Sequence, residues 1–191
     1  MANVVLGIPT MGSVDAQTFG SLMMLRRGEH KLFPLITEYS LVYIARENIV
    51  KRALENPITD YILFIDSDIV VEKDMLELLI QDDKDIVTGI YPYKQPGNLI
   101  VGRDLEDKDI TLEFFKDKQV KEILKCGLGC CLIKRKVFED IFEKFASCFE
   151  ARLHLGEDYV FCEKARACGY EIWMDSRVRC KHSGKMVYEV Q

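Results

Sequence analysis

The chain lacks the features that would mark a membrane-spanning, secreted or DNA-binding protein. Its 191 residues contain no apolar run that approaches the length of a membrane span. No basic region followed by an apolar stretch, as in a secretory signal peptide, opens the sequence. The net charge is −5 without a long basic run, so duplex nucleic acid is disfavoured as a partner. These absences predict a cytoplasmic protein without a transmembrane segment.

The cysteines also lack the pattern of a zinc site. All seven lie between Cys126 and Cys180, an odd number without paired C-x-x-C spacing. Several fall within apolar patterns, where a free cysteine behaves as a small buried hydrophobe. Reduced thiols are therefore expected.

What is present is an ordinary globular composition, with 48% hydrophobic and 30% charged residues. No repeat, low-complexity segment or linker divides the chain. The length suits one sizeable core, so we expect a single domain over residues 1–191.

Apolar runs alternate with helical patterns through residue 90, which predicts an α/β fold with a mixed, mostly parallel sheet flanked by helices. The predicted strands here are Val4–Ile8, Leu32–Thr37, Tyr61–Ile65 and Asp85–Ile90, and the predicted helices are Asp15–Arg27, Leu41–Asn56 and Glu72–Gln81. A small β-ribbon is predicted next, from Asn98–Val101 and Ile110–Phe115. The remaining predictions are strands at Cys130–Ile133, Glu171–Met174 and Arg177–Lys181 and helices at Lys136–Phe145 and from Glu157 to Gly169.

An apolar run, Tyr61–Ile65, leads directly into Asp66-Ser67-Asp68. In open α/β sheets, ligands bind beyond the carboxyl ends of such strands. Two carboxylates at this position suit a hard divalent cation that also contacts substrate phosphates. Two other Asp-x-Asp triplets, Asp83-Lys84-Asp85 and Asp107-Lys108-Asp109, do not follow a buried strand and are interpreted as solvated loops.

A second acidic pair, Glu157 and Asp158, opens a predicted helix. Carboxylates in a first turn stabilise the helix dipole and cap free amides, which is the ordinary interpretation. The functional alternative is a general base, because a positioned carboxylate can take the proton of an attacking alcohol.

Two further residues each allow two interpretations. His182 is either exposed near the chain end or completes the coordination of a cation such as Mn²⁺. Arg46 is either a surface cation on an amphipathic helix or a guanidinium that reaches phosphates beside a metal.

A glycine pair and two tyrosines are similarly ambiguous. Gly127-Leu128-Gly129 is either a plain turn or a place where backbone approaches a substrate closely. Tyr91 and Tyr93 are either the edge of the core or side chains that flank a sugar ring.

Taken in order, these segments resemble the GT-A-fold glycosyltransferases, and particularly glycosyltransferase family 2. The resemblance covers nearly the whole chain, with a nucleotide-binding half at about 1–90 and an acceptor and catalytic half at about 91–191. The similar segments are Val5–Thr10, Ala45–Val50, Tyr61–Asp68, Gly129–Phe138, Gly156–Cys162 and His182–Gly184.

The resemblance implies a role for each matching residue. Asp68, with Asp66, would bind Mn²⁺ or Mg²⁺ on a nucleotide-sugar diphosphate, with His182 as a further ligand; Asp66 serving the ribose or a bound water is the alternative. Asp158 would be the general base. The remaining donor-binding residues would be Pro9, Thr10, Glu38, Arg46 and Ser67, and the acceptor side would include Tyr91, Tyr93, Gly129 and Glu157. Glu38 is the one acidic residue available where the family has an acidic turn.

The implied reaction is the metal-dependent transfer of a sugar, with inversion, to an acceptor hydroxyl. The acceptor would be a glycan, a lipid-linked molecule or a protein, and the protein could bind peripherally to a membrane. A nucleotidyltransferase is a rival, although the turn at residues 7–12 lacks the basic residue that such enzymes carry there. A glycoside hydrolase would need no metal-diphosphate site. A non-catalytic module that binds nucleotide sugars or carbohydrates on the same fold is the third alternative.

Overall fold

The computed structural model describes residues 1–95 and 97–184. Its centre is a seven-stranded sheet whose strands, in spatial order, are β2 (Lys31–Glu38), β1 (Asn3–Thr10), β3 (Tyr61–Ile65), β10 (Cys130–Lys134), β5 (Ile86–Ile90), β11 (Ile172–Arg179) and β8 (Val120–Ile123). Strands β10 and β8 run against the other five. The sheet is therefore mixed and mostly parallel, as predicted.

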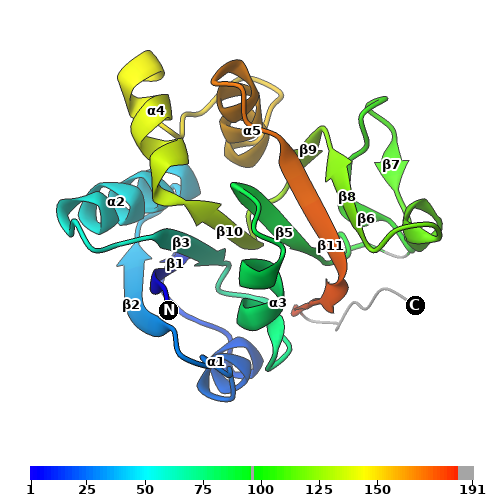
Figure 1. The fold of residues 1–191 in the computed structure, drawn as a ribbon, viewed down its shortest axis with the longest axis horizontal. Helices are drawn as coiled ribbons and strands as arrows, with labels where there is room; N and C mark the ends of the chain where they lie inside the picture. The colour runs from blue at the N-terminus through cyan, green and yellow to red at the C-terminus, as the bar shows by residue number, and fades with distance from the viewer. Residues whose placement is uncertain (96, 185–191) are drawn as a thin grey trace.

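Helices cover both faces of this sheet. They are α1 (Ala16–Met23), α2 (Val42–Glu55), α3 (Met75–Gln81), α4 (Arg135–Phe145) and α5 (Glu157–Ala167). In Figure 1, α2, α4 and α5 lie above the sheet and α1 and α3 lie below it. The flanking helices confirm the α/β prediction.

Alternation along β3 explains how one strand serves two cores. Ile62 and Phe64 are buried in the core under α2, α4 and α5, whereas Leu63 and Ile65 are buried in the core under α1 and α3. Successive side chains of a strand point to opposite faces, so a continuous apolar run is what a strand covered on both sides requires.

Two small sheets lie beside the main one. β12 (Lys181–His182) pairs with β4 (Ile69–Val70), and β6 (Ile100–Arg103) pairs with both β7 (Asp109–Ile110) and β9 (Lys125–Cys126). The first pairing brings the end of the described chain back to the turn after β3.

Three local predictions were wrong. The ribbon strand expected at Ile110–Phe115 is only two residues long, because a 3-10 helix, Leu112–Phe115, follows and buries Phe115. Strand β8 is missing from the prediction, since its lysine and glutamate give it a polar pattern. The two strands expected after Gly169 are one strand, β11, with an irregular register between Asp175 and Arg179.

The single domain expected over 1–191 remains a prediction, and its last residues, 185–191, lie outside the described part. Within that part, no helix combines the length and apolar character needed to cross a membrane.

Candidate active site

The Asp66–Asp68 turn lies at the carboxyl edge of the parallel strands, where β1 ends at Thr10 and β5 leads into Tyr91. The Asp66 amide donates to the Gly129 carbonyl (3.0 Å), and the Ile69 amide donates to the Asp66 carbonyl (3.1 Å). These bonds place both carboxylates beyond the sheet, where ligands of open α/β folds bind.

Distant segments hold this turn by its backbone. The Asp15 amide donates to the Ser67 carbonyl (2.8 Å), and the Ser183 amide donates to the Asp68 carbonyl (2.7 Å). The Ser183 hydroxyl also donates to the Asp15 carboxylate (3.0 Å). Asp15 caps α1 as predicted, by accepting from the Gln17 amide, and it also links the start of α1 to Ser67 and to Ser183.

A cavity of about 630 Å³ opens beside the turn. Its lining includes the predicted donor residues Pro9, Thr10, Asp66, Ser67 and Asp68. The Thr10 hydroxyl shapes the adjoining loop, because it donates to the Ser13 carbonyl (2.6 Å) and accepts from the Gly12 amide (3.1 Å). The volume lies within the range of small-molecule sites.

Arg46 is buried, which excludes the surface-cation interpretation. Its side chain is 3% exposed; Nη2 lies 2.5 Å from Asp66 Oδ1, and Nη1 donates to Glu157. Nε has no hydrogen-bond partner among the described residues. Although burial opposes it, the charges of Asp66 and Glu157 raise the pKa of Arg46, so this guanidinium stays charged and joins α2, β3 and α5.

Asp158 lies in the first turn of α5 without capping it. The N-cap is Gly156, and no described side chain makes a capping bond there. Among the described residues, the bond that Asp158 Oδ1 accepts is local, from the Tyr159 amide (2.8 Å). Burial raises the pKa of Asp158 to about 6, against the attraction of Arg46. A carboxyl group tuned in this way can accept a proton near neutral pH.

Asp68 carries a partner on each carboxylate oxygen. His182 Nε2 lies 3.5 Å from Oδ1, and Lys94 forms an ion pair with Oδ2. Although burial opposes it, hydrogen bonds from His182 and Lys94 lower the pKa of Asp68 to about 2. The imidazole is itself oriented, because His182 Nδ1 lies 3.0 Å from the Pro92 carbonyl oxygen.

The structure brings Asp68 and His182 together, whereas Asp66 faces Arg46. The described residues contain no group of three or more histidine, cysteine, aspartate or glutamate side chains arranged to hold a metal. A carboxylate and an imidazole are nevertheless a fitting partial donor set, since Mg²⁺ is usually held by one or two carboxylates plus substrate phosphates. The donor set suits a cation that arrives with a diphosphate.

Among the predicted acceptor-side residues, Tyr91 and Gly129 are in direct contact. The Tyr91 side chain is buried at the edge of the core, and its hydroxyl accepts a hydrogen bond from the Gly129 amide (2.9 Å). A Cβ added at Gly129 would lie 2.9 Å from the Tyr91 hydroxyl and 3.1 Å from Asp66 Oδ2. Gly129 therefore marks a close approach of side chains to backbone. The Tyr93 hydroxyl lies 3.2 Å from that of Tyr159.

The other predicted residue, Glu38, is exposed at the end of β2 and lies outside the cavity lining. Its carboxylate would be 3.8 Å from a Cβ added at Gly12, in the loop after β1. The two remaining Asp-x-Asp triplets take part in ion pairs away from this edge: Asp83 and Asp85 with Lys134, and Asp107 and Asp109 with Arg103.

Lys94 is missing from the sequence-based set. It lies in an irregular loop, where neither periodicity nor spacing distinguishes it from other surface lysines. Only its contact with Asp68 assigns it to the site.

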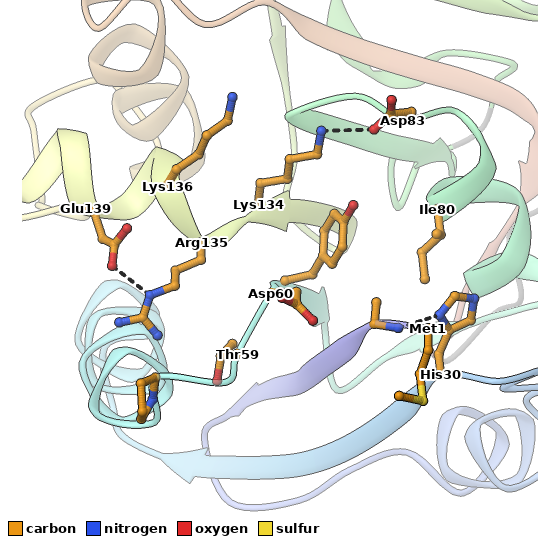
Figure 2. Close-up of a pocket in the computed structure, with 13 residues that line it drawn as sticks. Met1, His30, Thr59, Asp60, Ile80, Asp83, Lys134, Arg135, Lys136 and Glu139 are labelled. Carbon is orange, nitrogen blue, oxygen red and sulfur yellow. Dashed lines mark hydrogen bonds and ion pairs between the residues drawn. The ribbon is translucent and has the colours of Figure 1, made fainter.

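A larger cavity, of about 680 Å³, lies at the opposite edge, near the amino ends of β1 and β3 (Figure 2). Four of its charged side chains pair with one another: Lys134 with Asp83 (3.0 Å), and Arg135 with Glu139 (2.6 Å). Ligand sites of this fold class lie at the other edge, so the Asp66–Asp68 turn remains the candidate site.

Comparison with solved structures confirms the fold. A197 from STIV is 23% identical with a TM-score of 0.70, and the match covers all of this chain and 91% of that one. GalNAc-T7, solved with UDP, GalNAc and Mn²⁺, is 12% identical with a TM-score of 0.57, over all of this chain and 44% of that one. TarS 1–349 from S. aureus, solved with UDP-GlcNAc, is 13% identical with a TM-score of 0.55. This match covers 92% of this chain and 56% of the TarS chain.

The chain thus spans less than two thirds of the GalNAc-T7 and TarS chains. No curated protein matches it. The model of the family described as glycosyl transferase family 2 matches residues 43–142, which include Arg46, the Asp66–Asp68 turn and Gly129. The sequence-based resemblance is therefore confirmed, and the chain belongs to glycosyl transferase family 2.

Proposed function

We propose that the chain transfers a sugar from a nucleotide-sugar donor to an acceptor hydroxyl. The observation that carries this proposal is a connected cluster with two differently tuned carboxyl groups: Arg46 pairs with Asp66, two residues before Asp68, and with Glu157, the neighbour of Asp158. Asp68 has a pKa lowered to about 2 and pairs with His182, whereas Asp158 has a pKa raised to about 6. Such a separation suits one permanent anion that holds a cation and one base that exchanges a proton.

The donor would occupy the cavity of about 630 Å³, with Pro9 and Thr10 beside the nucleoside. Asp68 and His182 would hold Mn²⁺ or Mg²⁺, whose charge offsets the negative charge that grows on the departing diphosphate. Because Arg46 already occupies Asp66, we assign Asp66 to the ribose or to a bound water. GalNAc-T7, a protein of similar fold, was solved with UDP and Mn²⁺, which supports this choice of ligands.

Asp158 would act as the general base. Its carboxylate accepts the acceptor's hydroxyl proton while the acceptor oxygen forms a bond to the anomeric carbon. The bond from that carbon to the diphosphate oxygen breaks, and its electron pair leaves with the diphosphate. Attack opposite the leaving group inverts the anomeric centre. With a pKa of about 6, Asp158 is mostly ionised at pH 7 and can take the proton.

Arg46 would act indirectly. Its side chain lies beneath the carboxylates, with Asp66 on one nitrogen and Glu157 on another. It therefore fixes the turn after β3 relative to the start of α5, and its charge favours the ionised form of Asp158. A direct contact with the phosphates is not part of this role, because the buried Arg46 side chain would have to leave Asp66 and Glu157 to reach them.

The acceptor would approach along Tyr93 and Glu157 and would be a glycan, a lipid-linked sugar or a protein. Gly129 and Tyr91 are buried against each other, so they would support this side of the site without contacting the acceptor. We place the protein in the cytoplasm, either free or bound peripherally to a membrane, because all seven cysteines are free and six are buried. Reduced, buried thiols are typical of a reducing compartment.

Ligand-induced stabilisation tests the donor site. Nucleoside diphosphates and nucleotide sugars, each with and without Mn²⁺, should raise the melting temperature more in the presence of the metal than in its absence. Asp68→Ala should remove the metal-dependent part of the shift. An equal loss without metal would contradict coordination by Asp68.

Turnover separates an enzyme from a binding module on the same fold. Slow, Mn²⁺-dependent hydrolysis of the nucleotide sugar that stabilises best would support transfer, with water replacing the acceptor. Tight binding of every nucleotide sugar, without hydrolysis or transfer to any sugar acceptor, would support the module instead.

A further inference from the structure

Four consecutive residues after β5, Tyr91–Lys94, each contact a different part of the site. The contacts are Tyr91 hydroxyl with the Gly129 amide (2.9 Å), Pro92 carbonyl with His182 Nδ1 (3.0 Å), Tyr93 hydroxyl with Tyr159 hydroxyl (3.2 Å), and Lys94 with Asp68. The backbone of the segment is held as well, because the Tyr93 amide donates to the Leu99 carbonyl (3.2 Å) and the Tyr91 carbonyl accepts from the Val101 amide (2.9 Å). These contacts position the segment so that the Lys94 side chain reaches the Asp68 carboxylate.

The Lys94 ammonium occupies the place where a cation would be expected. It pairs with Asp68 Oδ2, while His182 lies 3.5 Å from Oδ1 on the same carboxylate. The Lys94 side chain is 41% exposed, and its flexible stem can leave without disturbing a buried cluster. Within the described residues, Asp68 is the one ion-pair partner recorded for this ammonium.

A divalent cation held by Asp68 Oδ1 and His182 would share one carboxylate with the Lys94 ammonium on Oδ2, and like charges this close repel each other. Binding of the cation therefore weakens the Lys94–Asp68 ion pair and favours release of the Lys94 side chain. The anion that arrives together with the cation is the donor's diphosphate, whose charge gives the released ammonium a new partner at the same sheet edge.

We propose that Lys94 is a tethered surrogate for the cation: its ammonium pairs with Asp68 when no metal is bound and moves to the diphosphate when a metal–nucleotide complex binds. This inference rests on the proposed function, since it assumes a cation on Asp68. It assigns to Lys94 two opposite effects, competition with the metal alone and cooperation with the nucleotide.

Binding of Mn²⁺ alone, followed by titration calorimetry or by the EPR signal of the free ion, tests the competition. Lys94→Met keeps the aliphatic stem and removes the charge, so its Mn²⁺ dissociation constant should fall about two- to fivefold, the range expected for losing one exposed ion pair. Lys94→Arg, which keeps the charge, should bind Mn²⁺ as the wild type does. Lys116→Met, at an exposed and distant ion pair with Glu113, is the matched control and should change nothing.

Repeating the Mn²⁺ titration with a saturating nucleoside diphosphate tests the cooperation. The nucleotide should tighten Mn²⁺ binding more in the wild type than in Lys94→Met, because only the wild type transfers an ammonium to the diphosphate.

The outcomes separate this inference from the proposed function. Equal Mn²⁺ affinities in wild type and Lys94→Met, with loss of binding in Asp68→Asn, would overturn the surrogate role and leave the metal site standing. Mn²⁺ binding in neither protein, with or without nucleotide, would overturn both.

Discussion

Arg46 and Asp66 form an ion pair of 2.5 Å on the buried side of the Asp66–Asp68 turn. The same guanidinium pairs with Glu157, a residue 111 positions later in the chain. It also lies over the Phe64 ring, 5.9 Å from its centroid, so one cation bridges two carboxylates against an apolar floor. One side chain, Arg46, thereby holds both the Asp66–Asp68 turn, where the metal is proposed to bind, and the start of α5, which carries the proposed base Asp158.

Arg46→Met should lower the free energy of unfolding by about 3 kcal/mol, because removing one partner leaves two half-buried carboxylates without compensation. Chemical denaturation at pH 7 measures the loss. Arg52→Met on the exposed face of the same helix is the control and should lie within about 0.5 kcal/mol of the wild type. A loss no larger than that of the control would contradict the bridging role.

The rate of transfer should fall on the acid side with an apparent pKa near 6, since Asp158 must be ionised to accept a proton. Asp158→Asn should reduce turnover about 10²- to 10⁴-fold and leave metal-dependent nucleotide binding nearly intact. Because Arg46 lowers the pKa of Asp158, Arg46→Met should move the acid limb to higher pH. An unchanged rate in Asp158→Asn would rule out this residue as the base.

The same Asp158→Asn substitution should stabilise the fold. The pKa of Asp158 is raised from 3.8 to about 6, so the folded state binds a proton between these values and the unfolded state does not. The contribution of Asp158 to the free energy of unfolding is thus most favourable at low pH and is lost as the pH rises from about 4 to 6. At pH 7 the variant should gain about 2 kcal/mol after allowance for solvent screening, with little gain at pH 4. A gain independent of pH would argue against ionisation as its cause.

Gly129→Ala should disturb the site through its new methyl group, which would press on the Tyr91 hydroxyl and on Asp66. A cost of about 1–3 kcal/mol in unfolding free energy is expected for such overpacking, together with weaker nucleotide binding in thermal-shift titrations. Gly20→Ala in α1 is the matched control, because nothing lies within 4 Å of its added Cβ. The control should be neutral or stabilising by up to about 1 kcal/mol. Equal behaviour of the two variants would exclude the close approach.

The sheet and the turn after β3 could be predicted because their causes are local. An apolar run followed by two aspartates is sufficient to place Asp66 and Asp68 at a strand end. The strand at Ile110–Phe115 was mispredicted because alternation over a few residues also fits the 3-10 turn that buries Phe115. The polar strand β8 is defined by its pairing with β11, which no local pattern records.

The side-chain network was harder to predict, since its causes are distant in sequence. Spacing on α2 left Arg46 undecided between surface and site, because its burial depends on Glu157 from another helix. The sequence left His182 undecided between an exposed residue and a cation ligand, and the pairing of β12 with β4, which places it beside Asp68, has no local pattern. Lys94 had no local pattern at all.

Strand β10 has a consequence for how the chain acquires this site. It lies between β3 and β5, so those two strands, although close in sequence, do not pair with each other. A nascent chain ending near residue 90 would hold β5 without either of its neighbours, and β10 and β11 are both made later. Folding must therefore wait for contacts of long sequence separation, which slows the search for the native state. The Asp66–Asp68 turn and Tyr91 come together only when Gly129 has been inserted between them.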